Sequence, residues 1–249
     1  MLWQRVVLSA VAAVLLVGLP MARASVVISG TRVIYPAEER EITVKLSNEG
    51  DTPALVQVWL DAGDPKPLPA EANVPFTLTP PLFRMDPKKG QTLRLIYTGQ
   101  PLPQDRESVF WLNVLEVPPK TKETNENENI MKLAFRYRIK LFFRPKGLPE
   151  NLDTAAAKLQ WRVVRNGGDV ELRADNPGAY HVTVVKMETA VDGKAYQNDV
   201  GGMIAPRDGL SFSLKEAGRP SAAAGKSEIR YRYLNDYGAE VDKSFGAEK

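Results

Sequence analysis

The chain has 249 residues, and 33 Lys and Arg residues against 30 Asp and Glu residues give it a formal charge of +3. It contains no cysteine, which excludes a disulfide scaffold, a thiol nucleophile and cysteine-ligated zinc. The excess of positive charge is too small to indicate binding to nucleic acid.

The first 24 residues have the pattern of a signal peptide. A short basic start, MLWQR, precedes an apolar run, and the segment ends in the small-x-small triplet Ala22-Arg23-Ala24. The apolar run is shorter than the roughly 18 to 20 residues that a membrane-spanning helix needs, so a retained anchor is the weaker interpretation. We therefore predict a signal peptide over residues 1–24 and a mature, exported chain that begins near Ser25.

Alternation of apolar and polar residues predicts β-strands through most of residues 25–146. The segments EITVKLSN, PALVQVWLDAG and QTLRLIYTG alternate, whereas SVFWLNVLEV is apolar on both faces, as a central strand would be. Six or seven strands separated by turn signals such as DPKKG are typical of an immunoglobulin-like sandwich, which we predict for this domain.

The segment RPKGLPENLDTA interrupts this pattern. Pro145, Gly147 and Pro149 lie close together in it, which is the composition of a linker between domains. Alternating segments resume after it, with hairpin turns at RNGGD and VDGK, and predict a second β-domain over residues 151–249. No segment after the signal peptide shows the 3.6-residue apolar period of a helix. The predicted fold class is all-β, with two immunoglobulin-like sandwich domains in tandem.

The stretch IMKLAFRYRIKLFFRP, residues 130–145, has two unlike faces. One face carries Met131, Leu133, Phe135, Tyr137 and Ile139, and the other carries Lys132, Ala134, Arg136, Arg138 and Lys140. The period of two is that of a β-strand. A surface strand would normally pack its apolar face on its own core, so the four cations and the very polar loop before them need an explanation from the rest of the chain.

The residues give little support for catalysis. His181 is the single histidine, and without cysteine or a second histidine no common transition-metal cluster can be built. No G-x-S-x-G elbow is present, so His181 is predicted to be a surface or packing residue. Glu38 and Glu39 lie in the turn YPAEERE, where acids are usually solvated. We predict a protein that is not an enzyme, has no metal site and uses no cofactor.

Five motifs follow one another along the chain: TRVIYP, PPLFRMDPKKGQTLRLIY, LPQDRESVFWLNVLEVPP, RIKLFFRP and YLNDYGAE. In this order and spacing the mature chain resembles periplasmic pilus (fimbrial) assembly chaperones of the PapD-like family. The resemblance implies a boomerang of two sandwich domains with a cleft between them. It also implies a periplasmic protein that binds, folds and caps pilus subunits by donor-strand complementation and delivers them to the outer-membrane usher.

The resemblance also implies roles for particular residues. Arg32 and Lys140 match the two basic residues that anchor the C-terminal carboxylate of the subunit. Met131, Leu133 and Phe135 match the apolar residues that the donor strand lends to the subunit. Lys140 lies on the opposite face of the strand from this donated set, so a strand twist or a bulge between residues 135 and 140 is expected to turn it toward the cleft.

Glu107, Arg144 and Asp236 match an interdomain ion-pair network that fixes the angle between the domains, which is a structural role. The donor strand itself presents an exposed apolar edge, and such edges tend to associate. We therefore predict that the protein free of subunit protects residues 131–135 by self-association.

Two other functions stay open at this level. A two-domain extracellular adhesion or carbohydrate-binding module would need an aromatic platform, for which Trp59, Trp111 and Trp161 are available. Each lies in an alternating segment, however, where packing in the core is the expectation. A self-assembling fimbrial subunit would need one incomplete domain and a donor arm at its N-terminus, whereas this sequence predicts two complete domains.

Overall fold

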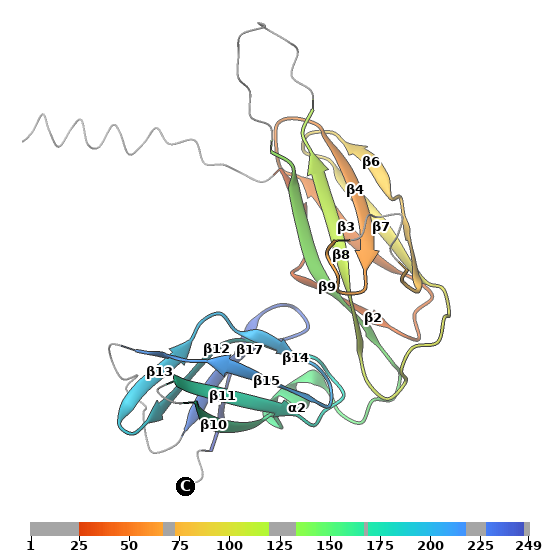
Figure 1. The fold of residues 1–249 in the computed structure, drawn as a ribbon. Helices are drawn as coiled ribbons and strands as arrows, with labels where there is room; N and C mark the ends of the chain where they lie inside the picture. The colour runs from red at the N-terminus through yellow and green to blue at the C-terminus, as the bar shows by residue number, and fades with distance from the viewer. Residues whose placement is uncertain (1–24, 67–72, 120–132, 167–168, 218–227, 247–249) are drawn as a thin grey trace, which may run out of the picture.

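The computed structural model describes residues 25–66, 73–119, 133–166, 169–217 and 228–246. The predicted signal peptide and Met131 lie outside the described residues, so the statements about them stay predictions. The described residues form two β-sandwiches joined end to end (Figure 1), which confirms the predicted fold class.

The first sandwich contains nine strands. They are Val26–Ile28 (β1), Arg32–Pro36 (β2), Ile42–Asn48 (β3), Ala54–Asp61 (β4), Phe76–Thr79 (β5), Leu82–Met85 (β6), Gly90–Tyr97 (β7), Ser108–Val117 (β8) and Phe135–Arg144 (β9). One sheet has the order β1-β3-β7-β5 and the other the order β2-β9-β8-β4-β6. Neighbouring strands are antiparallel except β2 and β9, which are parallel.

The core of this domain lies between its two sheets and follows the alternation in the sequence. Its buried side chains include Val44, Leu46, Val56, Leu93, Leu95, Leu112, Val114, Leu141 and Phe143. Tyr35 on β2 is also fully buried, and its hydroxyl lies 3.1 Å from the carbonyl oxygens of Glu39 and Arg40. A buried hydroxyl needs such partners, and these fix the end of β2 on the core.

The second sandwich follows the same principle. Its strands are Gln160–Asn166 (β10), Asp169–Asn176 (β11), Val182–Val191 (β12), Lys194–Asn198 (β13), Gly202–Ile204 (β14), Asp208–Ser213 (β15), Lys215–Glu216 (β16), Ile229–Leu234 (β17) and Glu240–Phe245 (β18). The sheet β10-β11-β15 faces the sheet β16-β13-β12-β17-β18, in which β14 also pairs with β12. Trp161 packs in the core between them, as predicted.

A short helix, α2 (Leu152–Ala157), lies where the sequence predicted only a linker. The side chain of Asn151 caps it by accepting a hydrogen bond from the backbone N–H of Thr154 at 2.9 Å. Leu152, Ala155 and Ala156 are buried against the second core. Six residues are too few to show a helical period, which is why that prediction was wrong here. Within the described ranges, no helix is long and apolar enough to cross a membrane.

The two sandwiches meet at the end of β9 and lie at an angle to each other (Figure 1). Several contacts cross the junction. The backbone N–H of Glu107 donates to the carbonyl of Ala179 at 2.9 Å, and Arg207 forms an ion pair with Asp105 at 2.5 Å. The segment that precedes β8 therefore contacts the second domain directly.

Replacing Asn151 with Ala should destabilise the second domain by about 1 kcal/mol, because the helix loses its cap. Urea denaturation, followed by tryptophan fluorescence, measures this change. Asn151→Ser keeps a capping oxygen and should stay within a few tenths of a kcal/mol of the parent chain. Equal destabilisation by both substitutions would show that the cap is not what holds α2.

Candidate functional site: a strand edge and two unpaired cations

Arg32 and Lys140 lie directly opposite each other in the parallel pair formed by β2 and β9. The next residues, Val33 and Leu141, are buried in the core of the first sandwich, so the two cations occupy the outer face of the same sheet. The structure thus brings together the two residues that the sequence singled out more than a hundred positions apart.

The second domain covers these cations on the outer face. Arg32 is 8% exposed and donates from Nη1 to the carbonyl of Leu234 at 3.2 Å. Its Nε is buried and has no hydrogen-bond partner among the described residues. Lys140 Nζ lies 3.4 Å from the hydroxyl of Thr183 on β12. The hydroxyl of Thr183 and the carbonyl of Leu234 satisfy part of the hydrogen-bonding capacity of the two cations, but as neutral groups they do not compensate the positive charges.

The electrostatics of the pair favour a bound anion. Burial lowers the pKa of Lys140, and the adjacent charge of Arg32 lowers it further. Burial also lowers the pKa of Arg32, although the charges of Asp236 and Glu107 oppose the effect. No acid in the described part of the chain lies within 4.0 Å of either cation. A carboxylate between them would relieve their repulsion and accept charge-assisted hydrogen bonds from both.

The pairing of β9 shows no bulge between residues 135 and 140, one of the two alternatives that the sequence suggested. The register of β8 and β9 runs without a shift from Glu116 opposite Phe135 to Ser108 opposite Phe143. Lys140 keeps its place on the outer face and meets the second domain because that domain lies across this face. Of the two alternatives, the bulge is therefore excluded, whereas the pairing does not test a twist of the strand.

One edge of β9 is open beside the cation pair. β8 pairs with β9 from Phe135 to Phe143, whereas β2 pairs only with its last five residues, from Lys140 to Arg144. Among the described residues, nothing pairs with the other edge of residues 135–139. Leu133 and Phe135 are 57% and 46% exposed at the start of this edge. The structure places both where a neighbouring strand could cover them.

Glu107, Arg144 and Asp236 form one ion-pair network across the domain junction. Arg144 donates from Nε to Glu107 at 2.9 Å and from both terminal nitrogens to Asp236 at 2.7 Å. Burial would lower the pKa of Arg144, but the two carboxylates outweigh it and raise that pKa. The other oxygen of Glu107 accepts the backbone N–H of His181, whose buried ring packs on Phe142. His181 is thus a packing residue.

Trp59 is 9% exposed and therefore buried, as predicted, whereas Trp111 is only half-buried. The guanidinium of Arg136 lies 4.8 Å from the ring centre of Trp59, and that of Arg138 lies 4.5 Å from that of Trp111. Both tryptophans belong to the outer face of the sheet, where the arginines of β9 cover them. The prediction of a packed ring is therefore confirmed for Trp59, which packs under Arg136, and is wrong for Trp111.

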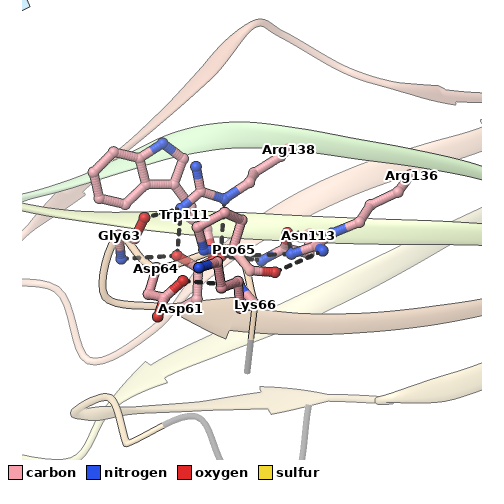
Figure 2. Close-up of polar contacts among 9 residues, drawn as sticks. All are labelled: Asp61, Gly63, Asp64, Pro65, Lys66, Trp111, Asn113, Arg136 and Arg138. Carbon is pink, nitrogen blue, oxygen red and sulfur yellow. Dashed lines mark hydrogen bonds and ion pairs between the residues drawn. The ribbon is translucent and has the colours of Figure 1, made fainter. Parts of the chain in front are cut away.

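Asp61 and Asn113 are polar residues of this face that the sequence analysis missed. Asp61 forms an ion pair with Arg138 at 2.5 Å, and Asn113 accepts two hydrogen bonds from Arg136 (Figure 2). A signal was available, because the three cations that alternate along one face of β9 need an acid on a neighbouring strand. Asp61, at the end of its strand, supplies that acid.

Replacing Arg144 with Met should cost about 3 to 5 kcal/mol of unfolding free energy, because it leaves buried Glu107 without a cation. It should also change the interdomain angle, and denaturation together with small-angle scattering measures both effects. Asp236→Asn is the milder variant, since Asp236 is more exposed and the pair of Arg144 and Glu107 remains. If both variants lost the same stability, Glu107 would not be the centre of the network.

Comparison with known proteins adds an independent result. Residues 25–149 match the family model of the PapD N-terminal domain of pili and flagellar-assembly chaperones, and residues 154–245 match that of the C-terminal domain of the pili assembly chaperone PapD. The chaperone protein FimB/FhaD of Bordetella pertussis is 47% identical over 240 residues, which is 94% of this chain and 93% of its own.

Two solved structures are also similar. The YadV chaperone, a probable fimbrial chaperone of Escherichia coli, has a TM-score of 0.71 at 41% identity and covers 89% of this chain and 99% of its own. The SafB chaperone of Salmonella enterica, solved in complex with the SafA pilin, has a TM-score of 0.70 at 27% identity and covers 91% and 98%. The chain belongs to the PapD family of pilus assembly chaperones.

Proposed function

We propose that this chaperone holds pilus subunits in the periplasm by pairing the open edge of β9 with them, and that it delivers them to the outer-membrane usher. One observation carries the proposal. The vacant edge of residues 135–139 leads directly to Arg32 and Lys140, where β2 begins. A subunit strand on this edge would be collinear with β2 and would place its end between the two cations.

The geometry also gives a direction to the added strand. The free end of a polypeptide that suits two cations is its C-terminal carboxylate, so the subunit strand would end near Lys140. It would therefore run parallel to β9, as β2 does. Its side chains would then cover Leu133 and Phe135, together with Met131 if the strand reaches that far. The pilin in the SafB complex supports a pilin as the partner here.

The expected free energies of binding indicate different roles for the apolar residues and for the two cations. Burying a large apolar side chain contributes roughly 1.5 to 3 kcal/mol, so Met131, Leu133 and Phe135 would supply most of the affinity. A charge-assisted hydrogen bond to a carboxylate contributes about 1.5 to 3 kcal/mol. The anchor formed by Arg32 and Lys140 then fixes the register, because a slip of one residue would turn the wrong face of the strand to the subunit.

The proposed function is binding alone, without a catalytic group or a cofactor. The predicted signal peptide supports a periplasmic location, and delivery to the usher follows from the family resemblance. The alternative of a carbohydrate-binding module loses its main support, since Trp161 lies in the core and arginines cover Trp59 and Trp111. These three rings offer no open aromatic platform.

The first test is affinity purification of the tagged mature protein from its native periplasm, with mass spectrometry of the proteins that co-purify. The parent chain should recover small pilin-like proteins. Phe135→Ser should lower the recovery and the affinity by at least tenfold, because one buried aromatic contact is lost. The double variant Arg32→Ala, Lys140→Ala should lose the fixed register of the complex, which site-specific cross-linking along β9 detects.

Val163→Ser is the control, since Val163 is 40% exposed on β10 of the second domain and should not affect recovery. Recovery of a glycan, or of no pilin by the parent chain, would refute the chaperone function proposed here. Unchanged yield and register in the double variant would contradict the role of Arg32 and Lys140 as an anchor. It would not affect the proposal that the open edge of β9 binds the subunit.

The free protein should also self-associate through residues 131–135, because the exposed edge can pair with a second copy. Sedimentation velocity at increasing concentration should show a dimer that Phe135→Ser weakens and that a bound pilin abolishes. A strict monomer throughout the concentration series would contradict this prediction.

A further inference from the structure

The outer face of β9 beside the open edge carries a cluster of side chains that the proposed function does not use. We call it the outer cluster, and Figure 2 shows its members apart from Trp59. It comprises Trp59 and Asp61 of β4, Trp111 and Asn113 of β8, Arg136 and Arg138 of β9, and the backbone of residues 63–65. The cluster thus links three strands to the loop that follows β4.

Asp61 is the centre of the cluster. The residue is 4% exposed, yet its carboxylate accepts hydrogen bonds on both oxygens. Arg138 donates to the two oxygens at 2.5 and 2.9 Å, Asn113 donates at 2.7 Å, and the backbone N–H of Gly63 donates at 2.8 Å. Burial alone would raise the pKa of Asp61, but these hydrogen bonds outweigh it and lower that pKa. Asp61 is therefore a charged, fully bonded acceptor at neutral pH.

Arg136 is held next to Arg138 by neutral acceptors. The side-chain oxygen of Asn113 accepts from its Nε at 3.0 Å and from its Nη2 at 2.7 Å, and the carbonyl of Pro65 accepts from its Nη1 at 2.9 Å. Asp61 lies 3.9 Å away. Each guanidinium also stacks on a tryptophan. The planar forks of both arginines are thus fixed by hydrogen bonds and by a ring, which restricts the backbone of β9 between them.

The outer cluster lies on the part of β9 that has only one neighbouring strand. Arg136 and Arg138 lie within residues 135–139, the stretch that has β8 on one side and no neighbour on the other. A strand held by a single ladder opens more readily than one held by two. On the inner face only Tyr137 and Ile139 pack partly against the core in this stretch. The outer cluster supplies the restraint that a second neighbouring strand would otherwise give.

We propose that Asp61 is a positioning residue, which keeps the open edge of β9 extended and in register for the incoming subunit strand. Asp61 touches no part of the subunit in this arrangement and acts through Arg138. The inference that this restraint serves subunit binding rests on the proposed function. The effect of Asp61 on the backbone of β9 can be measured in the protein without a subunit.

A purely electrostatic role for Asp61 predicts the opposite sign. Asp61 is opposite Trp111 in the register, and Trp111 is opposite Lys140, so Asp61 lies about 10 Å from the anchor across two strand spacings. Removing its negative charge would make the anchor slightly more attractive to a carboxylate, because about 10 Å is only a little more than the roughly 8 Å screening length of physiological salt. A positioning role instead predicts weaker binding in spite of the more positive field.

The experiment compares Asp61→Asn with the parent chain in two measurements. Hydrogen–deuterium exchange of the backbone amides of residues 135–139 should rise by about tenfold, because an ionic hydrogen-bond centre is lost. Binding of a synthetic peptide with the C-terminal strand of the co-purified pilin should weaken by about tenfold. The peptide is used both as the free acid and as the C-terminal amide, and the loss should occur with both.

Two further variants sharpen the result. Arg138→Lys keeps the positive charge and loses the two-pronged geometry, so it should reproduce the effects of Asp61→Asn. Glu41→Gln is the control, because it removes an arginine–carboxylate pair with Arg94 in the other sheet of the same domain. It should leave both measurements unchanged.

Unchanged exchange in Asp61→Asn, or tighter binding of the acid peptide with no change for the amide, would overturn the inference. The same holds if Arg138→Lys has no effect, since the charge alone would then suffice. If the parent chain fails to bind either peptide, the proposed function fails, and the exchange measurement still decides whether Asp61 positions β9.

Discussion

The site depends on one constraint, which is that β9 has two neighbouring strands along one half and a single neighbour along the other. From Lys140 to Arg144 it lies between β8 and β2, and its inner residues belong to the core. From Phe135 to Ile139 it pairs with β8 alone among the described strands. The rigid half fixes the strand to the domain junction, and the half with one neighbour keeps backbone groups available for another chain. Binding by strand addition needs both halves.

The distribution of charge around this strand follows from the same constraint. β9 carries four cations, and three of them have acidic partners. Arg136 and Arg138 share Asp61, and Arg144 has Glu107 and Asp236. Lys140 is the exception, together with Arg32 beside it. Because the acids nearest to the anchor are already engaged by other arginines, two adjacent positive charges persist at the end of the open edge. The first domain thus carries an internal repulsion that only an outside anion relieves.

Much of this could be predicted from the sequence, because the relevant signals are local. The alternation in residues 131–140 defined the strand and its two faces, and the motifs around Arg32 and Lys140 pointed to the same family that the comparisons show. The features that were predicted wrongly depend on contacts with parts of the chain that are distant in sequence. The register of β9 has no bulge, and Lys140 reaches the second domain only because that domain crosses the outer face. Trp111 was assigned to the core because a sequence does not show that its ring lies on the outer face, under an arginine that comes from a later strand.

The parallel pairing of β2 with β9 has a further consequence for partner selection. Beyond Lys140 the edge of β9 is already occupied by β2, so β2 acts as a physical stop for any strand that lies along the vacant edge. Only a chain that ends at this point can both fill the edge and place a carboxylate between the two cations. A chain with additional residues would have to leave the sheet, and a truncated one would leave the cations unpaired. Under the proposed function, the site would thus test where a subunit ends, and it would favour subunits whose synthesis is complete.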